Sequence, residues 1–168
     1  MRTLLEEHVP RVWRFALRLT GDRDQAEDLT QETLLRAWRH RRRLRDPNKT
    51  RVWLFKIATN LWRDQARRAR RHSEETTSSA DELPSSNMPP EQHVIDREDV
   101  QRTLDAMDGL PPRQREVLYL HACEGLCLAE IADVLDISSD AVKASLSLAR
   151  KRMRRQLDDL CPDRFPTG

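Results

Sequence analysis

Glycine and aromatic residues are scarce in this 168-residue chain, which has 4 glycines and 5% aromatic side chains. The sequence contains no glycine-rich run of the kind that cradles phosphate groups in nucleotide-binding proteins. Charged residues, in contrast, make up 35% of the chain. Few glycines and many charges favour short amphipathic helices over sheet, so the sequence predicts an all-α protein.

Long apolar runs are also lacking, and cysteines are few. No stretch approaches the roughly 20 apolar residues of a membrane-spanning helix, and the first seven residues hold two acids and no apolar signal segment. We therefore expect a cytoplasmic protein without direct membrane insertion. In that reducing compartment the three cysteines, Cys123, Cys127 and Cys161, are not expected to form a structural disulfide.

Side chains typical of catalytic or metal sites do not cluster along the sequence. The five histidines are scattered, and no pair of carboxylates stands out from the charged helix faces. Cys123, Cys127 and His121 are close in sequence, but three loosely spaced ligands are weak evidence for zinc, which usually binds four. A redox role for the two cysteines is the other reading, and we favour buried, reduced thiols. The sequence predicts no enzyme activity, no metal and no cofactor.

The charges are unevenly distributed, although the formal net charge is only +2. Residues 36–71 hold fourteen basic residues and two acids, and residues 143–155 hold six basic residues and no acid. Residues 73–109 between them hold ten acids and two arginines. Because residues 72–96 are rich in Ser, Thr, Pro and acids, we predict a flexible acidic linker there.

We predict one small helical domain on each side of this linker, at residues 1–71 and 97–160. Apolar spacing in the first domain predicts a helix from about Leu5 that ends at Gly21. A second helix, with Asp24 and Glu27 at its capped start, runs to about His40. Residues 41–49 form a basic loop, and a third helix begins near Arg51 and ends among the arginines before residue 72.

The second domain has the pattern of a helix-turn-helix. After two helices, over residues 96–107 and from Pro112 to about Glu124, the apolar spacing predicts a short helix at 128–135. A three-residue turn and a longer basic helix to about Leu157 follow, and the inward stripe of that helix is Val142, Leu146, Ala149 and Met153. In such motifs the second helix meets base edges through its N-terminal residues and phosphates through later basic residues. The candidate DNA-binding residues are Ser139, Asp140, Lys143, Ala144, Ser147, Arg150 and Lys151. A solvated basic face on an ordinary bundle helix is the alternative.

Two further helix faces have distinctive chemistry. On the third helix, cationic and polar residues share one face beside aromatic residues: Lys56, Asn60, Arg63, Arg67 and Arg70, with Trp53, Phe55 and Trp62. Cations beside flat apolar rings suit single-stranded nucleic acid, although the tryptophans are equally compatible with a core position. On the second helix, one face carries Asp28, Gln31, Glu32 and Leu35. Such a face suits docking onto a basic protein helix, and a solvated acidic stripe has the same periodicity.

Three segments together resemble RNA polymerase sigma factors of the extracytoplasmic-function group. The run DQAEDLTQETLLRAW (24–38) resembles the part of sigma region 2 that grips the polymerase clamp helices. The run WLFKIATN (53–60) and the arginines after it resemble the segment that melts and reads the minus-10 element. Residues 110–157 are similar to sigma region 4, which reads the minus-35 element.

The resemblance implies a sigma factor that binds core RNA polymerase, directs it to promoters and helps to melt the minus-10 element. It assigns polymerase binding to Asp28, Gln31, Glu32 and Leu35. It implies that the 41–49 loop captures a flipped base of melted DNA, with minus-10 contacts from Arg41, Arg42, Arg43, Lys49, Trp53, Lys56, Asn60, Arg63 and Arg67. It also implies an anti-sigma factor as a partner, in some cases one that holds the protein at the membrane. A stand-alone helix-turn-helix regulator is the alternative function.

The recognition helix departs from the family pattern. The family often has Ser-Arg after Val-Lys and another Arg three residues later, whereas residues 142–148 here read VKASLSL. We therefore expect an altered or weaker minus-35 preference, with Lys143, Arg150 and Lys151 supplying more of the attraction to phosphate. Asp136 replaces the glycine that is common in the turn, which Asp tolerates at modest cost if the backbone is left-handed.

Overall fold

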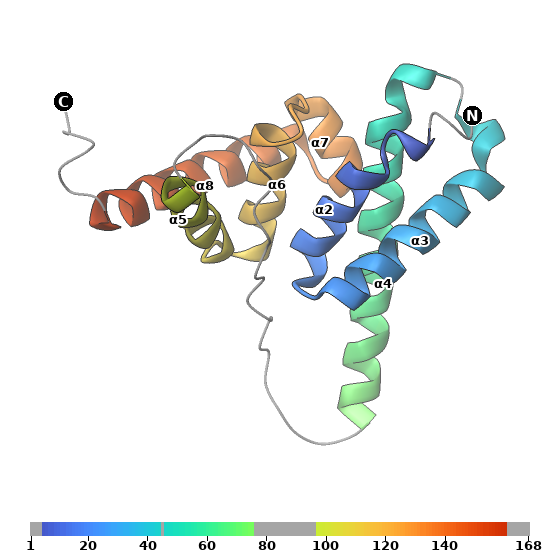
Figure 1. The fold of residues 1–168 in the computed structure, drawn as a ribbon, viewed down its shortest axis with the longest axis horizontal. Helices are drawn as coiled ribbons and strands as arrows, with labels where there is room; N and C mark the ends of the chain where they lie inside the picture. The colour runs from blue at the N-terminus through green and yellow to red at the C-terminus, as the bar shows by residue number, and fades with distance from the viewer. Residues whose placement is uncertain (1–4, 45, 76–96, 161–168) are drawn as a thin grey trace. The chain divides into compact units, whose positions relative to one another are not determined.

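The computed structural model describes residues 5–44, 46–75 and 97–160, and every regular element in these ranges is helical. This confirms the all-α prediction. The chain divides into two compact units. The first unit contains α2 (Val9–Thr20), α3 (Arg23–Arg39) and α4 (Thr50–Glu75) (Figure 1). The second unit contains α5 (Arg97–Asp108), α6 (Pro112–Ala122), the start of α7 (Leu128–Leu135) and α8 (Ser139–Leu160).

The predicted linker falls mostly outside the described residues. Helix α4 continues through Glu75, into the segment predicted as linker, and residues 76–96 are not described. The domain limits at residues 71 and 97 therefore stay predictions. Within the described ranges, no helix combines the length and the apolar character that crossing a membrane requires.

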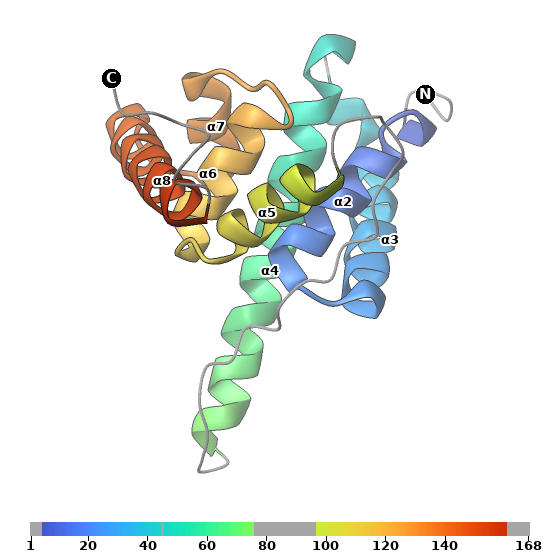
Figure 2. The ribbon, with the colours of Figure 1, turned by 60° about the vertical axis from the view of Figure 1, so that its left-hand side comes forward.

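In the first unit, α2 packs against α3 and α4, and α3 packs against α4. Both Figure 1 and Figure 2 show that the last turns of α4 project beyond α2 and α3. The core contains Phe15 and Phe55, whose ring centroids lie 4.9 Å apart. The prediction that Phe55 stands beside the cationic face of α4 is therefore wrong. Phe55 is fully buried because it lies on the side of α4 that faces α2.

Two helix starts in the first unit differ from the prediction. A turn at residues 7–8 interrupts the helical spacing, so α2 begins at Val9 rather than near Leu5. Helix α3 is capped by Asp22 instead of Asp24, because Asp22 has an extended backbone and its carboxylate accepts a hydrogen bond from the Gln25 N–H at 2.9 Å. As predicted, Gly21 ends α2, with a left-handed φ of 70°.

In the second unit, α5 and α6 pack against α8. The predicted inward stripe of α8 is confirmed, since Val142, Leu146, Ala149 and Met153 are all buried. Helix α6 ends at Ala122, two residues before the predicted limit. Gly125 then adopts φ 64°, and the Leu126 N–H donates to the Leu120 carbonyl at 3.0 Å.

The turn between α7 and α8 confirms the helix-turn-helix pattern. Asp136 has a left-handed φ of 52°, and the Ile137 N–H donates to the Ala132 carbonyl at 3.1 Å, which closes α7. Ser138 then caps α8, because its Oγ accepts a hydrogen bond from the Ala141 N–H at 3.1 Å. Three consecutive residues, 136–138, thus form the turn that leads the chain from α7 into α8.

Candidate binding surfaces

The acidic face of α3, formed by Asp28, Gln31, Glu32 and Leu35, lies opposite the buried side of that helix. The buried side includes two threonines, whose hydroxyls donate to backbone carbonyls four residues earlier, at 2.6 Å for Thr30 and 2.7 Å for Thr33. These bonds let polar residues be buried without loss of hydrogen bonding.

Charged and apolar groups are both available on the acidic face. Asp28 and Gln31 are exposed, Glu32 is partly exposed, and Leu35 has 50% of its surface exposed. The Glu32 carboxylate pairs with the Arg36 guanidinium at 3.2 Å within the helix. An exposed leucine among acids and an amide offers both charge and apolar area to a partner protein.

Trp38 extends this face, although it was not among the predicted polymerase-binding residues. It lies one turn after Leu35 and is 45% exposed. The Arg41 guanidinium carbon lies 4.8 Å from the Trp38 ring centroid, and Arg41 Nη1 donates to the Trp38 carbonyl at 3.0 Å. The signal in the sequence was the three-residue spacing from Leu35 to Trp38. The cation–π contact joins the acidic face to the basic loop that follows.

The basic loop, residues 41–49, contains two short 3₁₀ turns, η1 (Arg41–Arg43) and η2 (Pro47–Lys49). Asp46 organises the second turn, because its carboxylate accepts a hydrogen bond from the Asn48 N–H at 2.9 Å. The four predicted minus-10 residues of this loop, Arg41, Arg42, Arg43 and Lys49, are all exposed. The loop therefore presents a concentrated positive charge next to the start of α4.

On α4, the other predicted minus-10 residues differ in exposure. Asn60 and Arg67 are exposed, whereas Trp53, Lys56 and Arg63 are partly exposed. Arg70 belongs to α4, but its side chain is not among those described. The structure thus leaves part of the aromatic surface accessible beside the cations.

A groove between α3 and α4 brings together residues from two surfaces that were predicted separately. Gln25 and Asp28 of α3 lie across it from Trp62 and the small side chains of α4. The groove is open and has a volume of about 320 Å³. Asp28 and Trp62 therefore border one shared depression, a proximity that the helical spacing of either segment did not reveal.

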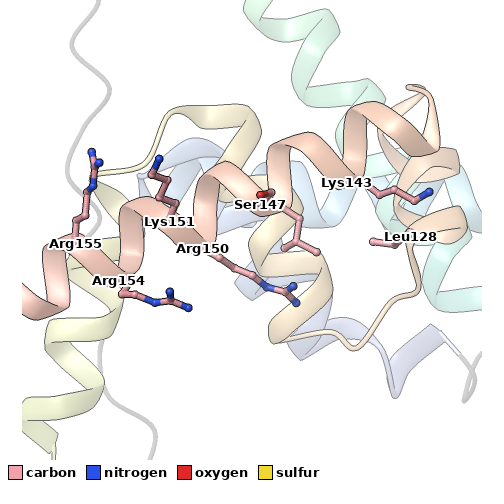
Figure 3. A pocket seen from close by; sticks show the side chains of 8 residues that line it. Leu128, Lys143, Ser147, Arg150, Lys151, Arg154 and Arg155 are labelled. Carbon is pink, nitrogen blue, oxygen red and sulfur yellow. The ribbon is translucent and has the colours of Figure 1, made fainter. Parts of the chain in front are cut away.

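All seven predicted minus-35 residues are exposed on α8. The Lys143 ammonium lies 3.6 Å from the Asp140 carboxylate, one turn earlier on the same helix. An open groove of about 700 Å³ follows α8 from Lys143 to Arg155, with Leu128 of α7 at one end. Figure 3 shows Arg150 and Arg154 extending from one side of α8, and Lys151 and Arg155 from the other.

Arg154 and Arg155 were absent from the predicted DNA-binding set. They line the same groove as Arg150 and Lys151 because they follow them at four-residue spacing. That spacing was visible in the sequence. The cationic surface of α8 is therefore longer than the predicted one.

The expectation of buried cysteines is wrong for Cys123 and Cys127, whose side chains are both exposed. Cys123 follows the last turn of α6, and Cys127 precedes α7, where its N–H donates to the Glu130 carboxylate at 2.8 Å. Both lie in the connection between two helices, so neither belongs to a core-facing helical stripe. Among the described residues, no three His, Cys, Asp or Glu side chains gather as a metal site would require.

Comparisons with known proteins match both units. Residues 4–72 match Sigma-70 region 2, and residues 101–153 match Sigma-70, region 4. The ECF RNA polymerase sigma factor SigL of Mycobacterium tuberculosis is 38% identical over 163 residues, which cover 95% of this chain and 90% of SigL.

Two solved structures are similar over most of the chain. The sigma factor RpoE from Bartonella quintana, in a co-crystal structure with the anti-sigma factor NepR, matches with a TM-score of 0.81 and 27% identity, over 94% of this chain and 96% of that one. CnrH, in complex with the cytosolic domain of CnrY, matches with a TM-score of 0.62 and 26% identity, over 94% and 86% of the two chains.

Proposed function

Because the chain belongs to the extracytoplasmic-function group of sigma-70 RNA polymerase sigma factors, we propose a division of work between its two helical units. The protein is a sigma factor that directs RNA polymerase to promoters. In our proposal the first unit docks on polymerase and holds melted minus-10 DNA, and the second unit reads the minus-35 duplex. The observation that carries the proposal is the pair of exposed surfaces of opposite charge, the acidic face of α3 and the cationic groove of α8.

Docking on core RNA polymerase takes place through the acidic face. Its carboxylates attract a basic partner and orient the encounter, and burial of an exposed leucine then holds the complex. Leu35 supplies that apolar area, and Trp38 adds to it at the next turn. The combination distinguishes this surface from a merely solvated acidic stripe, which has no need for exposed apolar side chains.

Minus-10 DNA is held by the basic loop and the cationic residues of α4. Taking a base out of the stack costs a few kcal/mol, and contacts to phosphates together with stacking on a ring offset that cost. The exposed arginines of the 41–49 loop supply the charge, and Trp53 supplies a partly exposed ring nearby along the chain.

Minus-35 DNA is bound by α8 in its major groove. Lys143, Ala144 and Ser147 lie in the first half of the helix, where a recognition helix meets base edges. Arg150, Lys151, Arg154 and Arg155 lie further along, where they attract phosphates.

The proposal includes an anti-sigma factor as a partner, because RpoE, which this chain resembles along most of its length, was crystallised with one. It places the protein in the cytoplasm and gives it no catalytic role. A stand-alone helix-turn-helix regulator accounts for α8 but leaves the acidic face, with its exposed leucine, without a partner.

The test separates docking from melting. A double substitution, Arg63→Ala with Arg67→Ala, is assayed for binding to core polymerase and for run-off transcription. We expect core binding to change less than twofold and transcription from duplex promoters to fall roughly tenfold or more, because two charged contacts to DNA are lost. A template with a pre-melted minus-10 region should restore much of the transcription.

The matched control is Arg68→Ala, an exposed arginine on another side of α4, which should transcribe as the unsubstituted protein does. If the double variant loses core binding and transcription equally, Arg63 and Arg67 support the fold rather than the melted DNA. A protein that binds promoter duplex tightly on its own and ignores core polymerase would instead support the stand-alone regulator.

A further inference from the structure

Leu148 is an exposed leucine in the middle of α8, with 50% of its surface accessible. The core-facing stripe of this helix begins at Val142 and includes Leu146 and Ala149, which are buried. At about 100° per residue, Leu148 lies roughly 240° around the helix from Val142, on the side away from the core. Packing within the second unit therefore does not account for an apolar side chain at this position.

Ala141 and Ala144 continue the apolar surface toward the start of α8. Both are exposed, and both lie within roughly 40° of Leu148 around the helix. We call Ala141, Ala144 and Leu148 the apolar strip. It occupies the half of α8 that would enter a DNA groove first, next to the candidate base readers Lys143 and Ser147.

The surroundings of the apolar strip are cationic. Lys151 and Arg155 follow Leu148 by three and seven residues, so they lie on the same side of the helix, and both are exposed. Residues 141–157 contain no acid, and Asp140, one turn before Ala144, pairs with the Lys143 ammonium at 3.6 Å. Single exposed leucines are common on protein surfaces, but a leucine and two alanines bordered by cations, on the outward side of a recognition helix, are suited to a polyanionic partner.

We propose that Leu148 and Ala144 read thymine methyl groups in the major groove of the upstream promoter element. Thymine is the base that presents a methyl group there, and apolar side chains recognise it by contact. The phosphates that border the groove match the cations that border the strip. This inference rests on the proposed function, in which α8 binds promoter duplex, and adds to it the bases that α8 selects.

The dimensions of the strip limit how many bases it reads. Ala144 and Leu148 are separated by about 6 Å along the helix axis, and successive bases rise by about 3.4 Å, so the pair spans about two base steps. Burial of one methyl group strengthens binding about fourfold. We therefore expect one or two thymines, at most about two steps apart, to contribute measurably to recognition.

Deoxyuridine provides a direct test, because it differs from thymidine only in lacking the methyl group. The probe is a genomic promoter fragment that yields a run-off transcript with the full-length protein and core polymerase. Each thymine upstream of the melted region is replaced in turn by deoxyuridine. The affinity of the full-length protein with core polymerase for each fragment is then measured. With the unsubstituted protein, we expect one or two positions at which the replacement weakens binding about fourfold.

Two variants connect this effect to the apolar strip. Leu148→Gln replaces an exposed leucine by a polar residue that is compatible with a helix. It should weaken binding to the thymine probe and abolish the difference in affinity between the thymine and deoxyuridine probes. Lys151→Ala should weaken binding to both probes equally and keep that difference, because a phosphate contact does not distinguish bases. Circular dichroism of Leu148→Gln checks that the helices are intact.

The failures of the two proposals are distinguishable. If transcripts form but every deoxyuridine probe binds the unsubstituted protein as the thymine probe does, the thymine reading is wrong and the proposed function stands. The thymine reading is also wrong if Leu148→Gln keeps the thymine preference. If the protein neither binds core polymerase nor yields any transcript, the proposed function itself fails. If Leu148→Gln loses binding to an inhibitor protein but keeps the difference between the thymine and deoxyuridine probes, the apolar strip binds a protein partner and the proposal is overturned.

Discussion

At the scale of single residues, Asp136 determines how the helix-turn-helix is closed. Its φ of 52° lies in the left-handed region, which disfavours L-residues with a side chain, and Asp is among the few that adopt it at modest cost. The residue sits between α7 and α8, where a glycine would meet the same geometry without that cost.

Substitutions at Asp136 test whether its left-handed backbone angle lowers stability. Asp136→Gly should raise the free energy of unfolding of the helix-turn-helix by about 0.5 kcal/mol, because relief of backbone strain outweighs the greater freedom of the unfolded chain. Asp136→Ala should lower it by about 1 kcal/mol, because alanine adopts the left-handed region less readily than aspartate. Urea unfolding followed by far-UV circular dichroism measures both changes. Equal effects of Gly and Ala would show that the backbone angle is not what matters at this turn.

At the scale of elements, the outward side of α3 combines acids with exposed apolar residues. Leu35 and Trp38 are one turn apart and both are exposed. Helix α3 packs against α2 and α4, but neither of these two side chains lies on the side that faces them. Apolar and aromatic side chains are typical of the centre of a protein interface, and polar or charged side chains are typical of its rim. The side chains on α3 therefore point to a macromolecular contact and not to stabilisation of the first unit.

Leu35→Ala should weaken binding to core RNA polymerase roughly tenfold, because truncation of a central side chain that carries much of the binding energy costs more than about 1 kcal/mol. The matched change is Leu148→Ala in α8, at a leucine with the same 50% exposure. That variant should bind core polymerase as before and lose affinity for promoter duplex instead. Surface plasmon resonance with immobilised core polymerase measures the first effect. If both leucine variants lose polymerase binding equally, α3 does not carry the docking surface.

At the scale of the whole molecule, the two compact units contain different spectroscopic reporters. The four tryptophans, Trp13, Trp38, Trp53 and Trp62, all belong to helices of the first unit. The single tyrosine, Tyr119, belongs to the second unit. Tryptophan fluorescence therefore follows unfolding of the first unit alone, whereas circular dichroism follows helices of both.

A matched pair of core substitutions exploits this separation. Val12 in the first unit and Val117 in the second are both almost completely buried, so valine to alanine costs about 2 kcal/mol at either site. Val12→Ala should lower the unfolding midpoint seen by tryptophan fluorescence, and Val117→Ala should leave it unchanged while broadening the transition seen by circular dichroism. Equal shifts of both signals in both variants would show that the chain unfolds as one cooperative unit.

Local regularities explain why much of the fold was predictable. Helical spacing identified the core stripe of α8, which is buried at all four predicted positions. Gly21 and the turn at Asp136 were predicted because left-handed backbone and helix breaking depend on the residues themselves and their immediate neighbours. These local features do not depend on how the helices pack against one another.

The sequence by itself thus determined the helices, the turn of the helix-turn-helix and the segregation of charge. Only the tertiary structure decided which side chains share a surface or a core. It buried Phe55 against Phe15, exposed Cys123 and Cys127, and brought Asp28 and Trp62 to one groove. It also left Leu148 accessible on α8. The physical reason is that periodicity gives a side chain's direction around its own helix, whereas burial depends on which neighbouring helix occupies that direction.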